Sequence, residues 1–157
     1  METGMNIIGV ISDTNGLLRR SATDALEGVG LILHAGDIDL PAVLDELTRI
    51  APVHAVRGNM DVNPGVRDLP AYTVVHVDGF AIGVTHDRFA LDVDPTAEGL
   101  AALVHGHSHR PAIEEKNGIY YINPGSAGPR RFRLPVTVGR IEIRNGKLFP
   151  RIIEIEV

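Results

Sequence analysis

The sequence contains no cysteine among its 157 residues. Disulfides and thiolate metal ligands are therefore excluded, and any bound metal must be held by His, Asp, Asn or Glu side chains. Seven histidines are available for that purpose. Nitrogen and oxygen ligands of this kind suit Mn, Fe, Ni or Zn, which are the metals that we expect if the chain binds one.

Long apolar runs and an excess of positive charge are also absent. No run approaches the ~18 apolar residues that a membrane-spanning helix needs. The first residues, Met1-Glu-Thr-Gly-Met5, lack the basic and then apolar pattern of a signal peptide. A net charge of -5 and an isoelectric point near 5.8 provide no broad positive field for nucleic acid or anionic membranes. We therefore expect a cytoplasmic protein without membrane contacts or strong nucleic-acid binding, which recognises an anionic substrate locally.

The sequence has no internal repeat, no low-complexity tract and no linker, and 44% of its residues are apolar. We therefore expect one domain, residues 1–157, with a full core. In the first half, short apolar runs that end at Gly or Asp predict buried strands, and helical spacing of apolar residues predicts helices between them. The predicted strands are 6–11, 31–34 and 53–56, and the predicted helices are 21–27 and 41–50, the second capped by Asp39.

Turn signals dominate the second half of the chain. Three β-hairpins are predicted, around Asp78-Gly79 as a type I′ turn, Asn117-Gly118 and Asn145-Gly146. Residues 88–99 predict an irregular loop and residues 96–102 a short helix, while skipped alternation near Gly139-Arg140 predicts a β-bulge. Strands joined by helices in the first half favour parallel pairing, and hairpins in the second half favour antiparallel pairing. Together they predict two packed sheets flanked by helices, a layered α/β sandwich.

Metal-competent side chains follow the predicted strands at the points where the strands end. The carboxyl ends of neighbouring strands meet at one edge of an open α/β sheet, and that edge forms the site in such folds. A single histidine there is more often structural than a ligand, but residues from five strand ends together indicate a metal site. The set comprises Asp13, Asn15, His34, Asp37, Asn59, Asp61, His86, His105, His107 and His109.

Three positions carry a more specific expectation. Asp37 follows Gly36, whose backbone can turn sharply, and its two carboxylate oxygens can bridge two cations. Asn59 offers a neutral amide oxygen, which leaves a bound metal more Lewis acidic toward phosphate. If the strand continues through His107 and His109, period-2 alternation points both histidines to the same side.

The motifs SDTNG, HAGD, RGNMD, VTHD and HGHSH follow one another along the chain, with Asn-Pro-Gly-Ser at 123–126. In this order they resemble the motifs of calcineurin-like metallophosphoesterases, most closely those of small single-domain bacterial and archaeal phosphodiesterases. The resemblance covers essentially the whole chain and implies a four-layer αββα sandwich with two mixed β-sheets flanked by helices. It also implies two divalent metal ions, one held by Asp13, Asn15, Asp37 and His109 and the other by Asp37, Asn59, His86 and His107.

The chain departs from the family pattern at several positions. Asn15 stands where the family has a histidine, so the first metal should bind more weakly. Met60 stands where relatives with a phosphatase-type site have a histidine thought to protonate the leaving group, and a thioether transfers no proton. Compact relatives commonly have Gly-His at this point, whereas here His86 is followed by Asp87-Arg88. The helix expected between residues 88 and 100 shows poor helical periodicity in this sequence. These last differences predict a remodelled substrate mouth.

We expect a metal-dependent phosphoric ester hydrolase, most specifically a phosphodiesterase, in which a hydroxide bridging two divalent ions attacks a small phosphodiester. Manganese is the metal that we expect first, with Fe, Ni or Zn as alternatives. Asp37 and Asn59 are expected to carry the chemistry. His34, Asp61 and His105 are expected to orient the ligands, because metal ligands are usually held by such contacts.

Two other interpretations stay open. The domain could be a catalytically impaired scaffold that binds proteins, as in the resembling retromer subunit, or a sensor that binds a metal or a nucleotide without turnover. Only one of the seven ligand positions is altered, which favours the enzyme. The sequence leaves open the natural substrate and whether the chain forms a homo-oligomer. The arginines at 88, 130, 131 and 133 are interpreted as solvated loop charges.

Overall fold

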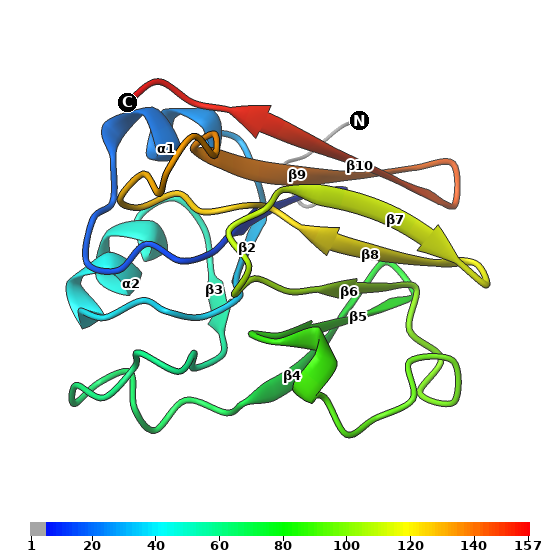
Figure 1. Cartoon of the computed structure of the whole chain (residues 1–157). Coiled ribbons are helices and arrows are strands. Elements are labelled where there is room, and N and C mark those ends of the chain that lie inside the picture. The colour runs from blue at the N-terminus through cyan, green and yellow to red at the C-terminus, as the bar shows by residue number, and fades with distance from the viewer. Residues whose placement is uncertain (1–5) are drawn as a thin grey trace.

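The computed structural model describes residues 6–157, and Met1–Met5, where the sequence shows no signal pattern, lie outside the described residues. The first sheet has the strand order β10-β9-β1-β2-β3 (Figure 1). Strands β1 (Ile7–Ile11), β2 (Leu31–His34) and β3 (Val53–Ala55) are parallel, and β9 (Thr137–Arg144) and β10 (Lys147–Glu154) add antiparallel pairs. Helices α1 (Arg20–Ala25) and α2 (Pro41–Thr48) connect the parallel strands, as predicted.

The second sheet has the strand order β4-β5-β6-β8-β7. Its strands are β4 (Tyr72–Val77), β5 (Phe80–Thr85), β6 (Ala102–Val104), β7 (Ala112–Lys116) and β8 (Ile119–Asn123). The three predicted hairpins are confirmed as the pairs β4–β5, β7–β8 and β9–β10. The first turn has φ of 50° at Asp78 and 84° at Gly79, as a type I′ turn requires.

Two apolar cores lie on opposite faces of the first sheet. The inner core, between the two sheets, includes Val10, Leu33 and Ile82. The outer core, between the first sheet and the helices, includes Ile11 and Leu47. Neighbouring residues of β1 therefore enter different cores. Burial on both faces explains why the parallel strands are continuous apolar runs rather than alternating ones.

The predicted β-bulge near Gly139-Arg140 is wrong. β9 pairs with both β1 and β10 in an unbroken register across this segment. Val138 packs in the outer core and Ile141 in the inner core. The skipped alternation therefore reflects a strand that is buried on both faces, not an extra residue in the strand.

Two predictions about helices are also wrong, one about an N-cap and one about a whole helix. The N-cap of α2 is Leu40, followed by Pro41 at the start of the helix, whose fixed φ suits that position. Asp39 has φ 74° and its side chain instead accepts a hydrogen bond from Asn63 (2.9 Å). Residues 95–99 form only a turn, and β6 already begins at Ala102, so the helix predicted at 96–102 does not form.

The predicted sandwich of two mixed sheets is confirmed, with few helices. Both α1 and α2 pack on the outer face of the first sheet. On the second sheet, Leu100 packs against Gly83, on the face opposite Ile82. A short 3-10 turn, η2 (Arg88–Ala90), and the irregular segment 91–100 stand there in place of a helix. Within residues 6–157, no helix has the length and apolarity needed to cross a membrane.

Candidate active site

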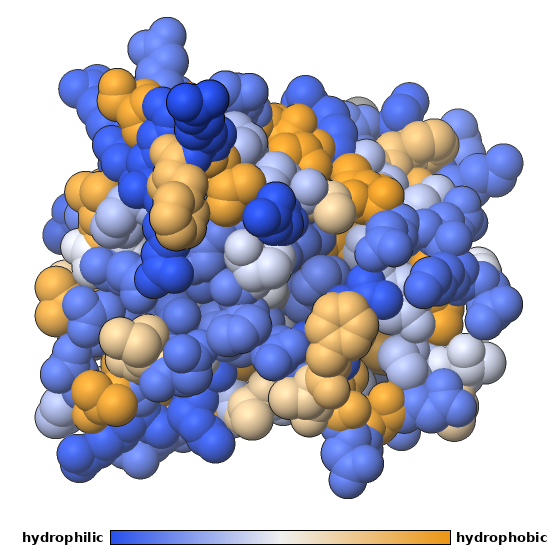
Figure 2. Space-filling view, in the orientation of Figure 1, coloured by the Kyte–Doolittle hydropathy of each residue, from blue (hydrophilic) through white to orange (hydrophobic). Residues whose placement is uncertain are grey.

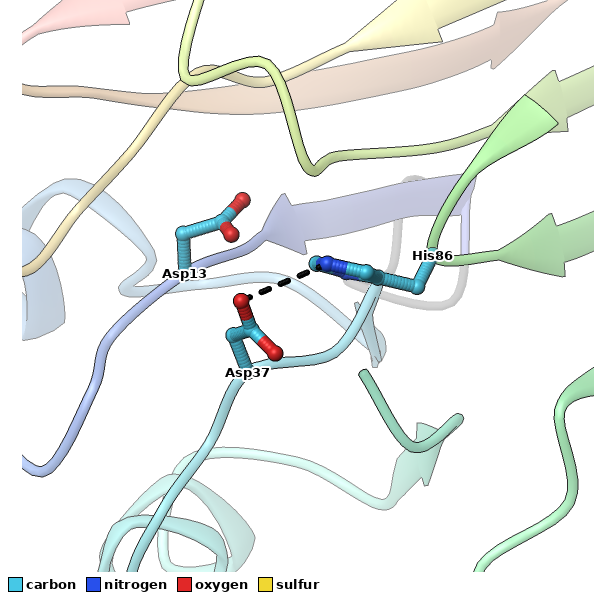
Figure 3. A group of neighbouring side chains, drawn as sticks. All are labelled: Asp13, Asp37 and His86. Atoms are coloured by element: carbon cyan, nitrogen blue, oxygen red, sulfur yellow. Dashed lines mark ion pairs between the residues drawn. The ribbon is translucent and has the colours of Figure 1, made fainter. Parts of the chain in front are cut away.

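Three side chains from three loops face one another where strands of both sheets end (Figure 3). Asp13 follows β1, Asp37 follows β2 and His86 follows β5, and one ligand atom of each lies within 4.8 Å of the others. The Nε2 atom of His86 is 3.3 Å from Asp37 Oδ2. All three side chains are buried. The structure thus brings together three of the residues that the sequence singled out.

His107 and His109 reach this cluster from the loop that follows β6. The Nε2 atom of His109 is 3.5 Å from Asp13 Oδ1, and the His107 amide donates to Asp13 Oδ2 (3.2 Å). The Nδ1 atom of His107 lies 3.3 Å from His86 Nε2. The expected reason for this convergence is wrong, because β6 ends at Val104. Left-handed backbone at both histidines, with φ of 73° and 65°, replaces strand alternation.

Asn15 and Asn59 lie at the edge of the cluster. Asn15 donates its side-chain amide to the carbonyl of Asp13 (3.4 Å), so it turns back toward its own loop. Asn59 is exposed and lines a pocket together with His86 and His107. The second asparagine therefore lies beside the histidines with which it is predicted to share a metal, and the ligand role of each asparagine stays a prediction.

Backbone in the left-handed region is concentrated in the site loops. Only a few per cent of non-glycine residues adopt positive φ, and such strain gathers at functional sites. Six residues of these loops have φ between 46° and 74°: Asp13, Asn15, Asp37, Asp39, His107 and His109.

Glycines let the loops approach closely. A Cβ atom at Gly58 would collide with Asp37, and one at Gly36 would press on the His86 ring.

Asp61 holds the loop that carries Asp37. Its buried carboxylate accepts four backbone N–H groups. Oδ2 accepts from Asp37 (3.0 Å) and Gly58 (2.8 Å). Oδ1 accepts from Ile38 and Asp39, both at 2.8 Å. One carboxylate thereby fixes the backbone of Asp37 and of the two residues after it and ties them to Gly58 on the loop after β3. Its role in orienting a metal ligand stays a prediction.

His34 links the loops after β1 and β2. Its Nδ1 accepts from the Gly36 amide (3.1 Å), so the ring proton is on Nε2, which donates to Thr14 Oγ1 (3.0 Å). The Thr14 hydroxyl in turn donates to the Ile38 carbonyl (3.4 Å). Burial lowers the pKa of His34 to about 3, which keeps the ring neutral. A neutral ring with a fixed tautomer positions the two loops against each other.

His105 lies in a charge network that sequence interpretation missed. Burial, with a further contribution from Arg88, lowers the pKa of His105 to about 4. Arg88 donates to Glu114 Oε1 (2.8 Å), and its guanidinium lies 4.4 Å from the Tyr121 ring centroid. Arg88 is therefore held against β7 and β8, which corrects its interpretation as a solvated loop charge. The pair spans 26 positions in the sequence, so no local pattern predicts it.

The Asn-Pro-Gly-Ser segment at 123–126 supports two of the site loops. Asn123 donates its side-chain amide to the Gly106 carbonyl (3.2 Å) and to Ser108 Oγ (3.1 Å). The Ser126 hydroxyl donates to the carbonyl of Asp13 (3.1 Å). The segment that accompanies the family motifs thus holds the backbone of both the first and the last ligand loop.

The electrostatics of the cluster separate its two aspartates. Burial raises the pKa of Asp13 to about 6, although the Ser12 hydroxyl works against it. Burial also raises the pKa of Asp37, but hydrogen bonds from His86 and the Met60 amide outweigh this, and the pKa ends below its ordinary value. The pKa of His86 is raised, since contacts with both aspartates exceed the effect of burial. Of the two carboxylates, Asp13 is therefore the one whose burial is less offset by hydrogen bonds and nearby positive charge.

The donor set fits a divalent cation. Among the described residues, the buried atom Asp13 Oδ1, which faces His109 Nε2, has no hydrogen-bond partner. Leaving such a buried group unpaired costs about 1–3 kcal/mol, more when it is charged, and a bound cation would relieve that cost. Carboxylate oxygens and imidazole nitrogens suit Mn, Fe or Zn. The geometry of Asp13, Asp37 and His86 therefore allows the three side chains to hold a metal ion together.

Comparisons with known proteins agree with this geometry. Residues 5–146 match the model of the calcineurin-like phosphoesterase superfamily domain. Over 149 residues the chain is 36% identical to a probable metallophosphoesterase of Methanothermobacter thermautotrophicus, covering 87% of this chain and 86% of the relative.

Solved structures with this fold include proteins of different kinds. An archaeal phosphodiesterase superposes with a TM-score of 0.76 at 21% identity, covering 94% of this chain and 99% of the other. Vacuolar protein sorting 29 from Cryptosporidium parvum superposes with a TM-score of 0.75 at 23% identity, covering 95% and 97%. At these identities the likeness establishes the fold alone.

Proposed function

The chain belongs to the calcineurin-like phosphoesterase superfamily, and from this premise we propose that it is a metal-dependent phosphoric ester hydrolase that prefers phosphodiesters. The observation that carries the proposal is the buried group of Asp13, Asp37 and His86, in which, among the described residues, Asp13 Oδ1 has no hydrogen-bond partner. Membership of the family, a cation-competent donor set and an adjoining pocket all support hydrolysis at this place.

The proposal assigns the site residues to two ions. Asp37 would be shared, because its carboxylate carries two oxygens and has a ligand atom within 4.8 Å of those of both Asp13 and His86. The other ligands are Asp13, Asn15 and His109 for one ion, and Asn59, His86 and His107 for the other. When bound, the ions supply an activated water as nucleophile and positive charge that offsets the phosphate oxygens. His34 and Asp61 hold the ligand loops in place.

The leaving-group preference follows from Met60. This residue is 55% exposed beside Asp37, to whose Oδ1 its backbone amide donates (2.9 Å). Its thioether cannot donate a proton to a departing alkoxide. Esters whose leaving group departs as a stable anion should therefore react fastest, which favours aryl phosphodiesters over alkyl phosphomonoesters.

Metal removal tests the proposal. We expect turnover of bis(p-nitrophenyl) phosphate to fall to background in EDTA and to return on addition of Mn²⁺, because the ions supply the nucleophile. Alkyl phosphomonoesters should react at least ~10²-fold more slowly, the lower end of what a general acid contributes. Turnover that survives EDTA would contradict the metal requirement, and equal rates on both esters would contradict the diester preference.

Binding of metal without turnover would instead favour a scaffold or a sensor. A protein-binding scaffold typically exposes a contiguous apolar patch. Figure 2 shows apolar residues in small separate groups among hydrophilic ones on the face in view. The face in view therefore offers a scaffold no contiguous apolar patch.

Residue 15 provides a second test of the ligand set. Asn15→His should tighten binding of one metal ion by at least about 10-fold and raise turnover at limiting metal, because imidazole is the stronger ligand. Asn15 has φ 46°, a conformation in which histidine is also enriched. The matched control is Asn145→His, at an exposed hairpin turn with φ 52°. Unchanged affinity in a calorimetric metal titration would show that residue 15 is not a ligand.

A further inference from the structure

A pocket of ≈ 520 Å³ opens on one side of the metal cluster. Three proposed metal ligands, Asn59, His86 and His107, are among the residues that line it. A phosphate group at the metals would therefore place one of its ester groups in this pocket, called here the side pocket. Its volume lies within the ~300–1,000 Å³ range of small-molecule sites.

Apolar side chains form the outer wall of the side pocket. Tyr72 at the start of β4 contributes an aromatic ring, and Leu91 and Val93 contribute aliphatic groups from the segment after η2. Leu91 and Val93 are half-buried, so part of their apolar surface remains free for a ligand. Leu91 and Val93 belong to the segment between residues 88 and 100, where the sequence predicts a remodelled substrate mouth.

The wall is held in place before any ligand binds. Arg88, whose side chain is 13% exposed, joins the start of the segment to Glu114 on β7 at 2.8 Å. Its guanidinium also stacks on the rings of Tyr121 (4.4 Å) and Phe89 (4.9 Å). The Asp87 carboxylate accepts from the Phe89 amide (3.1 Å). A wall that is already ordered binds a ligand at a smaller entropic cost.

The charges of the side pocket disfavour a second anionic group. Two carboxylates, Asp87 and Asp92, line it together with one cation, Arg57. Arg57 already donates one hydrogen bond to the Leu69 carbonyl (3.1 Å). A phosphate or carboxylate entering the pocket would meet more negative than positive charge, so polyphosphates and phosphorylated sugars fit poorly.

We propose that the side pocket binds an uncharged, ring-bearing ester group, so that the substrates are monoanionic phosphodiesters with one bulky group of aryl or nucleoside type. This inference rests on the proposed hydrolase function, because that function places the phosphate at the metals. Specificity comes from the apolar wall of Tyr72, Leu91 and Val93, while the metal ligands recognise only the phosphate.

Equilibrium binding to the Mn²⁺-loaded protein tests the inference. In calorimetric titrations, diphenylphosphinate should bind at least about 10-fold more tightly than dimethylphosphinate, because only the phenyl groups bury apolar surface. Both ligands keep the monoanionic PO₂ group and have no ester bond that the protein could hydrolyse. A dithymidine phosphodiester, which has a slowly departing alkyl group, distinguishes a nucleoside from a simple aryl group in a parallel titration. Equal affinities for the dimethyl and the ring-bearing ligands would overturn the inference.

Variants locate the preference in the pocket wall. Leu91→Asp, or Val93→Asp if the first fails to fold, should reduce the preference for diphenylphosphinate to less than about 2-fold, since a carboxylate in the pocket wall opposes burial of the ring. Phe149→Asp is the matched control, because Phe149 is 41% exposed on β10, outside the pocket. A preference that survives in the wall variants would place the ring elsewhere.

Turnover of bis(p-nitrophenyl) phosphate, measured on the same samples, separates the two proposals. If the binding preference depends on Leu91 but no turnover is measured, the hydrolase function is contradicted and the pocket proposal stands. Metal-dependent turnover without a binding preference would contradict the pocket and retain the hydrolase function.

Discussion

The Asp37→Asn variant is expected to lose at least about 10³-fold in kcat/KM on bis(p-nitrophenyl) phosphate. Changes to the partners of metal ligands typically cost about 10–100-fold, and the shared ligand itself should cost more. Asparagine keeps the shape of the side chain but leaves only one acceptor oxygen and no charge. It therefore weakens both the 3.3 Å contact with His86 and the capacity to hold two cations. Elemental analysis of the purified variant should show less than the wild-type metal content.

The matched control for this change is Asp45→Asn, an identical substitution on the exposed surface of α2. It should keep wild-type kinetics and metal content, because surface charges of this kind contribute little. Circular dichroism and thermal unfolding in EDTA check that both variants are folded. An Asp37→Asn protein with full metal content and full turnover would remove Asp37 from the proposed mechanism.

Elements set by local chemistry were predicted from the sequence. Each hairpin has glycine at the second turn position, where the type I′ geometry requires positive φ, and all three hairpins form. The buried parallel strands were predicted from continuous apolar runs. The bulge and the helix at 96–102 were predicted wrongly because tertiary contacts decide those segments. Val138 and Ile141 face different cores, and Leu100 packs on Gly83 instead of extending a helical turn.

The candidate site shows the same division between local and long-range causes. Polar residues at the ends of predicted strands indicated that Asp13, Asp37 and His86 lie at one place. The left-handed turns that carry His107 and His109 were not predicted, because alternation in a strand gives the same convergence. The charge pair of Arg88 with Glu114 joins distant segments and has no signature in either one.

Asp61 is the residue whose replacement should most strongly destabilise the fold around the site. In Asp61→Asn, one carboxylate oxygen becomes an NH₂ group, and either orientation of the amide leaves two of the four backbone N–H donors without an acceptor. A hydrogen bond to a charged group is worth about 1.5–3 kcal/mol, so the free energy of unfolding should fall by about 3–5 kcal/mol. For a domain of this size that corresponds to a Tm lower by roughly 6–20 °C.

Urea unfolding in EDTA measures this loss without a contribution from bound metal, which would otherwise stabilise the native state. Asp68→Asn is the matched control, because the Asp68 side chain is 87% exposed and only approaches Arg67 at 3.7 Å. That control should stay within about 1 kcal/mol of wild type. Metal affinity should also fall by about 10–100-fold in Asp61→Asn, since three of the four donors are the backbone amides of Asp37 and of the two residues that follow it. An unfolding midpoint equal to that of the Asp68→Asn control would show that the four hydrogen bonds do not hold the Asp37 loop.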